Sequence, residues 1–163
     1  MSTPSVRRVS HLEILCAVNA QQLIDEYAAE CSVADADPQV ELYAAVEQAG
    51  ALHCFGAYVT PQRHGPVAGD PVAGDELVGF ISVLNSPMLH NGKRVATIES
   101  FFVLAAHRRS GAGNRLLAAA KAYASESGCL GLLYTARIGS RLEKVLSRRA
   151  GCERSHTVFT EWL

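Results

Sequence analysis

The feature that most constrains the fold is a short segment joining a strand pattern to a helix pattern. Residues 94–104 are rich in β-branched and aromatic side chains, which is typical of a strand. Residues 114–127 are rich in Ala and Leu and are followed by Gly128, which predicts a helix. Between them lies the stretch Arg108-Arg109-Ser110-Gly111-Ala112-Gly113. Because a helix N-terminus has unpaired backbone N–H groups and a partial positive charge, we expect this junction to bind a phosphate group.

Patterns before this junction predict helices and antiparallel strands. A helix is expected over residues 11–32, followed by a break at 34–38. A second helix then runs to Gly50, with Asp37 as its N-cap and Pro38 in its first turn. Strands are expected over 51–60 and 76–84, and Asn91-Gly92 predicts a turn before the third strand. A short additional strand is expected over residues 6–9.

Patterns after the junction continue the alternation. Residues 130–135 form an apolar run, which predicts a buried central strand. A helix over 140–149 would place Leu142, Val145 and Leu146 on one face and end at Gly151, and a strand pair is expected over 152–163. The fold class is therefore mixed α/β, with a sheet that is antiparallel in its first part.

Length and composition favour one compact domain over residues 1–163. The chain has 48% apolar and 19% charged residues, within the ordinary globular range. A chain of this length buries roughly two-thirds of its unfolded surface, which suffices for one core. The motif Pro-Val-Ala-Gly-Asp occurs at 66–70 and again at 71–75, which predicts a lengthened surface loop.

Cysteine usage and hydropathy favour a cytoplasmic protein. No Cys-x-x-Cys pair occurs, so no zinc or dithiol site is predicted, and reduced thiols are expected. No apolar run approaches the ~20 residues of a membrane span, and no signal segment is expected. The five cysteines are Cys16, Cys31, Cys54, Cys129 and Cys152.

Charge is divided unequally along the chain. The net charge is −1, but residues 1–100 carry −7 and residues 101–163 carry +6. No Lys or Arg occurs between Val9 and Gln62, where there are eight acidic residues. One interpretation is two solvated helix faces. The other is a bipolar site, with an anion bound by the second half and a cation approaching the first.

The loop lacks residues that two common phosphate-binding motifs require. A Walker A loop ends in Gly-Lys-Ser/Thr, whereas this loop ends in Gly113-Asn114-Arg115. A dinucleotide fingerprint needs a third glycine where Leu116 stands. Both nucleotide classes are therefore disfavoured.

The remaining pattern, Arg-x-x-Gly-x-Gly at Arg108, Gly111 and Gly113 after a strand containing Val103, resembles the acyl-CoA loop of the GNAT (Gcn5-related) N-acetyltransferases. The order of elements resembles that fold over essentially the whole chain, and the chain looks most like small acetyltransferases of phage and prophage genomes. The resemblance implies a central mixed, twisted sheet flanked by helices, with a V-shaped split between its central strands. It also implies acetyl-CoA (coenzyme A) as the cofactor.

The resemblance also implies the cofactor-binding residues. Main-chain groups of the central strand would pair with the pantetheine arm, and an amide near Phe102 or Val103 would stabilise the developing oxyanion. Backbone amides of the following loop would bind the pyrophosphate. The implied set is Phe102, Val103, Leu104, Ala105, Arg108, Arg109, Ser110, Gly111, Ala112, Gly113 and Asn114.

Glu99 is the candidate catalytic base. It is the one carboxylate of the central strand, and Ile98, Phe101 and Phe102 beside it would solvate its charge poorly. Its pKa is therefore expected to rise toward neutrality, as a base that activates an amine requires. The alternative is that Glu99 pairs with a basic neighbour on a half-exposed strand face.

The general acid departs from the family pattern. Many members have a tyrosine four residues before the glycine that closes the last helix, and here that position is Ser147. Ser147 or a water would then protonate the leaving thiolate, and Tyr134 is the nearest aromatic hydroxyl in the sequence. His90 and His107 are interpreted as surface residues, although the resemblance would allow His90 to face an acceptor.

The predicted function is therefore transfer of an acetyl group from acetyl-CoA to a primary amine, by direct attack in a ternary complex. The acceptor would be a small molecule or peptide, cationic before deprotonation. A CoA-binding module with weak or lost catalysis and a structural or host-interaction protein remain as alternatives. Neither nucleic acid nor a membrane is an expected partner, no metal is expected, and the oligomeric state stays open, a homodimer included.

Overall fold

The computed structural model describes residues 3–31, 39–60 and 75–155. The chain divides into two units, Met1–Leu133 and Tyr134–Leu163, and each is described by itself. The first unit contains one sheet of five strands in the order β1-β2-β3-β4-β5. The strands are β1 (Ser5–Val9), β2 (Leu52–Val59), β3 (Glu76–Pro87), β4 (Arg94–Val103) and β5 (Cys129–Leu133).

The sheet is mixed, as predicted. Neighbouring strands from β1 to β4 are antiparallel, and β5 is parallel to β4. The additional strand expected near residue 6 is confirmed as β1, and the turn at Asn91-Gly92 is confirmed by a positive φ of 68° at Gly92. The strand predicted over 76–84 is confirmed as β3, which extends to Pro87.

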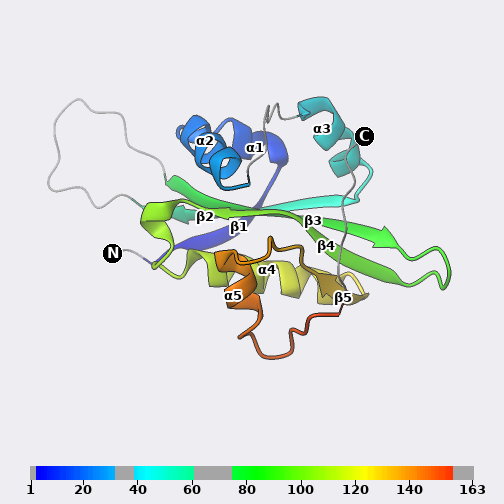
Figure 1. Cartoon of the computed structure of the whole chain (residues 1–163). Coiled ribbons are helices and arrows are strands. Elements are labelled where there is room, and N and C mark those ends of the chain that lie inside the picture. Colours follow the sequence, from blue (N-terminus) through cyan, green and yellow to red (C-terminus); the bar gives the residue numbers. More distant parts are fainter. Residues whose placement is uncertain (1–2, 32–38, 61–74, 156–163) are drawn as a thin grey trace, which may run out of the picture. The chain divides into compact units, whose positions relative to one another are not determined.

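Helices cover both faces of this sheet (Figure 1): α1 (His11–Leu15), α2 (Ala20–Cys31) and α3 (Val40–Gln48) lie over one face, and α4 (Ala112–Glu126) over the other. This explains why β3 is buried continuously from Leu77 to Val83 rather than at alternate positions. On the α1–α3 side the core includes Leu23, Leu52 and Phe102. Buried residues of α4 cover the opposite face.

The single helix predicted over residues 11–32 is wrong, because the chain forms two helices there. α1 ends at Leu15, and Val18 is fully exposed between α1 and α2. The side-chain amide of Asn19 donates to the carbonyl of Leu77 in β3, at 2.9 Å. This bond fixes the start of α2 on the sheet, an arrangement that depends on a residue 58 positions away.

The prediction of a buried central strand at 130–135 is also wrong. β5 ends at Leu133, and Leu130 and Leu133 are 62% and 47% exposed. In the described part of the chain, β5 has β4 as its one neighbour, so the apolar run lies at the edge of the sheet.

The second unit contains α5 (Arg141–Leu146). The helix predicted there is confirmed but shorter, and Val145, expected on the packed face with Leu146, is 39% exposed. Residues 152–155 form no strand. The rest of the expected strand pair lies outside the described residues, as do the break at 34–38, the Asp37 cap and residues 66–74 of the repeat. α3 begins after an N-cap at Gln39.

Candidate active site

Glu99 occupies a β-bulge of β4. The register of β3 with β4 passes from Ser82–Ser100 to Val83–Ile98, so that Glu99 is the extra residue. A bulge changes the direction of the side chain at this point. Glu99 is exposed, while Ile98 and Ser100 on either side of it are buried. The poorly solvated environment expected for Glu99 is therefore wrong.

Among the described residues, the partner of Glu99 is a tyrosine and not a basic residue. Its Oε1 accepts a hydrogen bond from the hydroxyl of Tyr43 in α3, at 2.8 Å. No other hydrogen bond or ion pair of Glu99 occurs among residues 3–31, 39–60 and 75–155. The second carboxylate oxygen is thus available to accept a proton from a bound molecule.

Beyond Glu99, one edge of β4 has no neighbouring strand in the described part of the chain. The ladder between β4 and β5 ends at Thr97–Leu133, whereas β4 continues to Val103. The amide of Leu104 donates to Val78 of β3, at 3.0 Å. Because successive residues of a strand present their main-chain groups to opposite sides, those of Phe101 and Val103 face the edge without a neighbour. Because β5 itself ends at Leu133, the ladder ends where this strand ends, and the V-shaped split expected between the two strands stays a prediction.

The loop after β4 is ordered by its own hydrogen bonds. A short 3-10 helix, Ala105–His107, is followed by Ser110, whose hydroxyl donates to the carbonyl of His107 at 2.7 Å. The amide of Ala112 donates to the Ser110 hydroxyl at 3.3 Å. Gly111 is the N-cap of α4 with a φ of 89°, a left-handed conformation that favours glycine. The sequence Ser110-Gly111 therefore ends the turn and starts the helix.

Three amides at the start of α4 form no hydrogen bond in the described part of the chain. Within the described ranges, no acceptor lies within hydrogen-bond distance of the amides of Gly111, Gly113 and Asn114. They belong to the first turn of a helix of 15 residues, where no intrahelical partner exists. A β-carbon on Gly113 would meet atoms no closer than 3.5 Å, so no close contact within the described residues requires glycine at this position.

Two acidic residues of α2 hold the start of the loop. The amide of Ala105 donates to Oε2 of Glu26 at 3.1 Å, and this bond is the main reason that the pKa of Glu26 is lowered. The guanidinium of Arg108 forms an ion pair with Glu30 and also donates to the carbonyl of Val103 at 3.0 Å. Ala105 and Arg108, both expected to bind cofactor, are thus already bonded to the protein.

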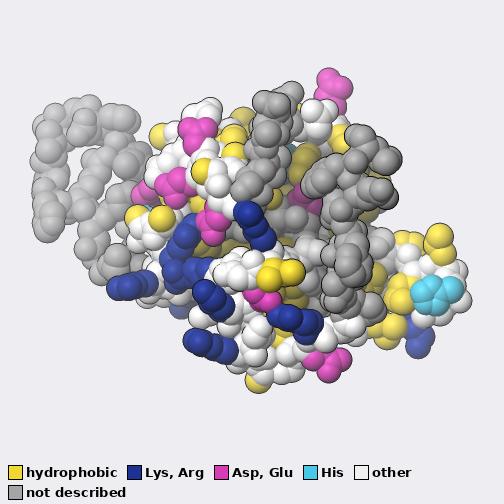
Figure 2. Space-filling model, in the orientation of Figure 1, with side chains coloured by type: hydrophobic (Ala, Val, Ile, Leu, Met, Phe, Trp, Pro, Cys, Tyr) yellow, Lys and Arg dark blue, Asp and Glu magenta, His cyan; other side chains and the backbone are white. Residues whose placement is uncertain are grey.

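The remaining basic residues of the junction are exposed. Arg109 and Arg115 form no ion pair in the described part of the chain. Figure 2 shows Lys and Arg side chains gathered on the face of the molecule that it draws. The charges of Arg109 and Arg115, which lie next to Gly111 and Gly113 in the sequence, raise the local positive potential at the start of α4.

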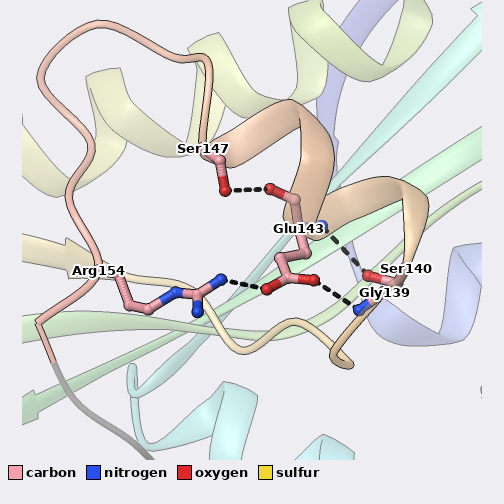
Figure 3. Close-up of polar contacts among 5 residues, drawn as sticks. All are labelled: Gly139, Ser140, Glu143, Ser147 and Arg154. Atoms are coloured by element: carbon pink, nitrogen blue, oxygen red, sulfur yellow. Dashed lines mark hydrogen bonds and ion pairs between the residues drawn. The ribbon is translucent and has the colours of Figure 1, made fainter.

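Ser147 lies in the second unit, at the end of α5 (Figure 3). Its hydroxyl donates to the carbonyl of Glu143 at 2.8 Å. The carboxylate of Glu143 accepts from the amide of Gly139 and forms an ion pair with Arg154. The proton of the Ser147 hydroxyl therefore bonds within its own helix. Burial raises the pKa of Tyr134, and the nearby Arg149 opposes this effect.

Other kinds of site have no support among the described residues. The described residues contain no group of three or more His, Cys, Asp or Glu side chains placed to bind a metal ion. A search of the same residues finds no helix with the length and apolar character needed to cross a membrane.

Comparison with known proteins identifies the class of protein that this fold and junction define. Residues 20–144 match the acetyltransferase (GNAT) family. No curated protein matches the chain. Similar structures include a ribosomal-protein-alanine N-acetyltransferase from Brucella melitensis biovar Abortus 2308, with 18% identity, a TM-score of 0.67, and 99% and 100% of the two chains covered.

Two further structures have the same fold. An aminoglycoside acetyltransferase from an uncultured soil metagenomic sample, in complex with sisomicin, is 17% identical with a TM-score of 0.69 over 99% and 97% of the chains. AAC(6')-Iy, in complex with the bisubstrate analogue CoA-S-monomethyl-acetylneamine, is 17% identical with a TM-score of 0.68 over 99% of both chains.

Because the family match spans more than half of its length, the chain belongs to the acetyltransferase (GNAT) family. It is a GNAT-type N-acetyltransferase, as predicted from Arg108, Gly111 and Gly113. Enzymes of this family use acetyl-CoA.

Sequence reasoning does not identify three residues that support the predicted site. Tyr43 bonds to Glu99, His11 stacks on Tyr43, and Glu26 accepts from the Ala105 amide. The helical pattern puts Tyr43 on an apolar face, and no local pattern reveals that α3 brings it to the bulge of β4. The one signal in the sequence is the stretch from Val9 to Gln62 without Lys or Arg. It indicates an acidic first half without selecting single residues.

Proposed function

We propose that the protein transfers an acetyl group from acetyl-CoA to a primary amine by direct attack in a ternary complex. The observation that carries this proposal is the junction of β4 with α4. There, the amides of Gly111, Gly113 and Asn114 have no acceptor in the described part of the chain, and they follow a strand edge without a neighbour. Such a row of donors with a positive helix end suits a pyrophosphate.

The proposed cofactor site extends from this loop along β4. In the loop from Arg108 to Asn114, the amides of Gly111, Gly113 and Asn114 would bind the pyrophosphate, with the charges of Arg108 and Arg109 beside them. The amides of Arg108, Ser110 and Ala112 already have acceptors in the protein. The Val103 carbonyl, at the edge of β4 that has no neighbouring strand in the described part of the chain, would pair with the pantetheine arm after releasing the hydrogen bond that it accepts from Arg108. Between the two candidate oxyanion donors, alternation of the strand favours the Val103 amide, because that of Phe102 faces β3. Bound acetyl-CoA supplies the activated thioester.

Glu99 is proposed as the base. It takes a proton from the ammonium form of the acceptor, directly or through a water, so that the nitrogen lone pair is free. The nitrogen then forms a bond to the acetyl carbon as the carbon–sulfur bond breaks, and the electron pair leaves with the sulfur. The nitrogen, which now carries one proton more than the amide product, releases that proton, and a water, or Ser147 after releasing its bond to Glu143, passes it on to the thiolate. A thiol pKa near 8.5 makes thiolate an acceptable leaving group.

The acceptor is proposed to be a cationic amine on a small molecule or a peptide. The helices that cover the Glu99 side of the sheet, α1 to α3, carry acidic residues and no Lys or Arg: Glu13, Asp25, Glu26, Glu30, Glu41 and Glu47. Two of the similar proteins are named for acceptors of these two kinds: one is a ribosomal-protein-alanine N-acetyltransferase and the other is an aminoglycoside acetyltransferase.

Two measurements test this function. Acetyl-CoA at 100 times its Kd should stabilise the fold by about 2.7 kcal/mol, seen as a higher melting temperature. If acetyl-CoA does not raise the melting temperature, the remaining alternative is a structural or host-interaction protein that does not bind the cofactor. Thiol release over a panel of peptide, polyamine and aminoglycoside acceptors then distinguishes an enzyme from a CoA-binding module.

Glu99→Gln tests the base. We expect kcat to fall about 100-fold or more, because general-base catalysis contributes on the order of 10²–10⁴. The affinity for acetyl-CoA, measured by calorimetry, should change little. Retained turnover with weakened cofactor binding would refute the assignment of Glu99.

A further inference from the structure

Tyr43 and Glu99 are joined across 56 residues of sequence. Tyr43 Oη donates to Glu99 Oε1 at 2.8 Å, which links α3 to the bulge of β4. Burial, together with the negative charge and hydrogen bond of Glu99, raises the pKa of Tyr43 well above its usual value. The phenol therefore remains protonated at every working pH and acts as a donor to the carboxylate.

The ring of Tyr43 is itself held in place. His11 in α1 stacks on it, with ring centroids 3.8 Å apart and an interplanar angle of 7°. The backbone amide of His11 donates to Oε2 of Glu47 in α3, at 3.2 Å, and so ties the two helices together. Both ring nitrogens of His11 are buried and lack a hydrogen-bond partner among the described residues. The imidazole of His11 therefore contacts Tyr43 through its ring face and forms no hydrogen bond with it.

A carboxylate at a bulge needs such support. The Glu99 side chain is exposed and has three rotatable bonds, and the bond from Tyr43 is its one hydrogen bond in the part of the chain that the structure describes. Without it the carboxylate would sample several rotamers. With Oε1 engaged, Oε2 is the atom left to take a proton.

We propose that Tyr43 is a positioning residue for Glu99, and that His11 holds the Tyr43 ring in the orientation from which its hydroxyl reaches Oε1. This inference rests on the proposed role of Glu99 as the base. Tyr43 acts through Glu99 and takes no proton itself.

Tyr43→Phe is the direct test, because it removes the hydroxyl and keeps the ring that stacks on His11. We expect kcat to fall about tenfold, at the lower end of what a hydrogen bond to a charged group contributes, with KM for acetyl-CoA within about twofold. Tyr58→Phe is the matched control: Tyr58 lies in β2 under Arg7, away from Glu99, and should leave kcat unchanged.

A double-mutant cycle separates positioning from direct action. If Tyr43 acts through Glu99, Tyr43→Phe has no further effect on kcat in the Glu99→Gln background. Multiplicative effects would overturn the inference, because they would mean that Tyr43 acts on the acceptor or the fold independently. Full activity of Glu99→Gln would instead refute the proposed base, so the two failures are distinguishable.

The pH dependence of kcat/KM gives a readout that a merely structural role would not move. The phenol donates its hydrogen bond to the carboxylate that is proposed as the base, so the acid limb should differ from that of the wild type in Tyr43→Phe and not in Tyr58→Phe. The titratable groups around this carboxylate are Tyr43 and Glu47 on α3, His11 on α1 and Cys54 on β2. An unmoved acid limb in Tyr43→Phe would overturn the inference.

His11→Ala keeps the inference testable if Tyr43→Phe folds poorly. It retains the hydroxyl and removes the stacked ring, so kcat should fall less than in Tyr43→Phe. The loss should again disappear in the Glu99→Gln background. Unchanged kcat in His11→Ala would refute the part assigned to the stack.

Discussion

At Gly79 of β3, the addition of a single methyl group should destabilise the fold, because the neighbouring strand leaves no space for a β-carbon. It pairs with Val103 of β4. A β-carbon at Gly79 would lie 2.7 Å from the backbone oxygen of Phe102, 3.0 Å from Cγ2 of Val103 and 3.1 Å from its Cα. Two of these three atoms are backbone and cannot rotate away. Since comfortable contacts lie near 3.5–4.0 Å, the strands must separate by roughly 0.5–1 Å.

Gly79→Ala should therefore destabilise the fold. Overpacking of a core costs about 1–3 kcal/mol, and the backbone advantage of Ala over Gly returns about 0.5–1 kcal/mol. A net loss of roughly 0.5–2 kcal/mol should lower Tm by roughly 1–8 °C for a chain of this size. Because Val103 must move, KM for acetyl-CoA should also rise. Thermal unfolding followed by circular dichroism and steady-state kinetics measure the two effects.

Two other glycines provide matched comparisons. At Gly131 in β5 a β-carbon would meet nothing within 4 Å, so Gly131→Ala should keep the full Tm. At Gly56 the contacts are Cε2 of Tyr58 at 2.8 Å and Cδ1 of Leu77 at 2.9 Å, both at side-chain ends that can shift. Gly56→Ala should thus lie between the other two. If Gly79→Ala proves as stable as Gly131→Ala, backbone contact is not what requires glycine at 79.

The remaining predictions concern buried titratable groups. Burial lowers the pKa of His11 below 6.5, although the carboxylates of Glu99 and Glu47 oppose it, and burial also lowers that of His53. The unfolded chain then binds more protons than the folded one, so stability should fall as pH drops below about 6.5. Tm measured from pH 8 to 5 should therefore decrease less steeply in His11→Phe than in the wild type. His90→Asn, a control at an exposed position, should keep the full decrease. An equally steep decrease in His11→Phe would contradict the reasoning. Burial raises the pKa of Cys54 to about 11, so iodoacetamide at pH 8 should modify the exposed Cys16 and leave Cys54 unmodified until the protein unfolds. Peptide mass mapping would reveal the opposite order if Cys54 were accessible.

The strand–loop–helix junction is predictable from sequence because its determinants are local. Gly111 needs a positive φ, and Gly113 and Asn114 supply first-turn amides, whatever packs around them. The same holds for the turn at Gly92. Because these rules need only neighbouring residues, the resemblance to the family is visible in the amino-acid sequence itself.

The features that sequence reasoning misses depend on contacts between distant segments. The bulge at Glu99 is a property of the register between β3 and β4, so the exposure of this carboxylate could not be derived from its apolar neighbours. The break between α1 and α2 depends on the bond of Asn19 to Leu77. β5 has the apolar composition of a central strand, yet it lies at the edge of the described sheet.

α2 bears on the engineering of this enzyme. Glu26 holds the Ala105 amide and Glu30 pairs with Arg108, so a helix of the layer that is proposed to face the amine also fixes the turn before the amides that are proposed to bind the diphosphate. Grafting this layer from a relative to change acceptor preference would therefore alter cofactor affinity as well, unless both glutamates were carried over.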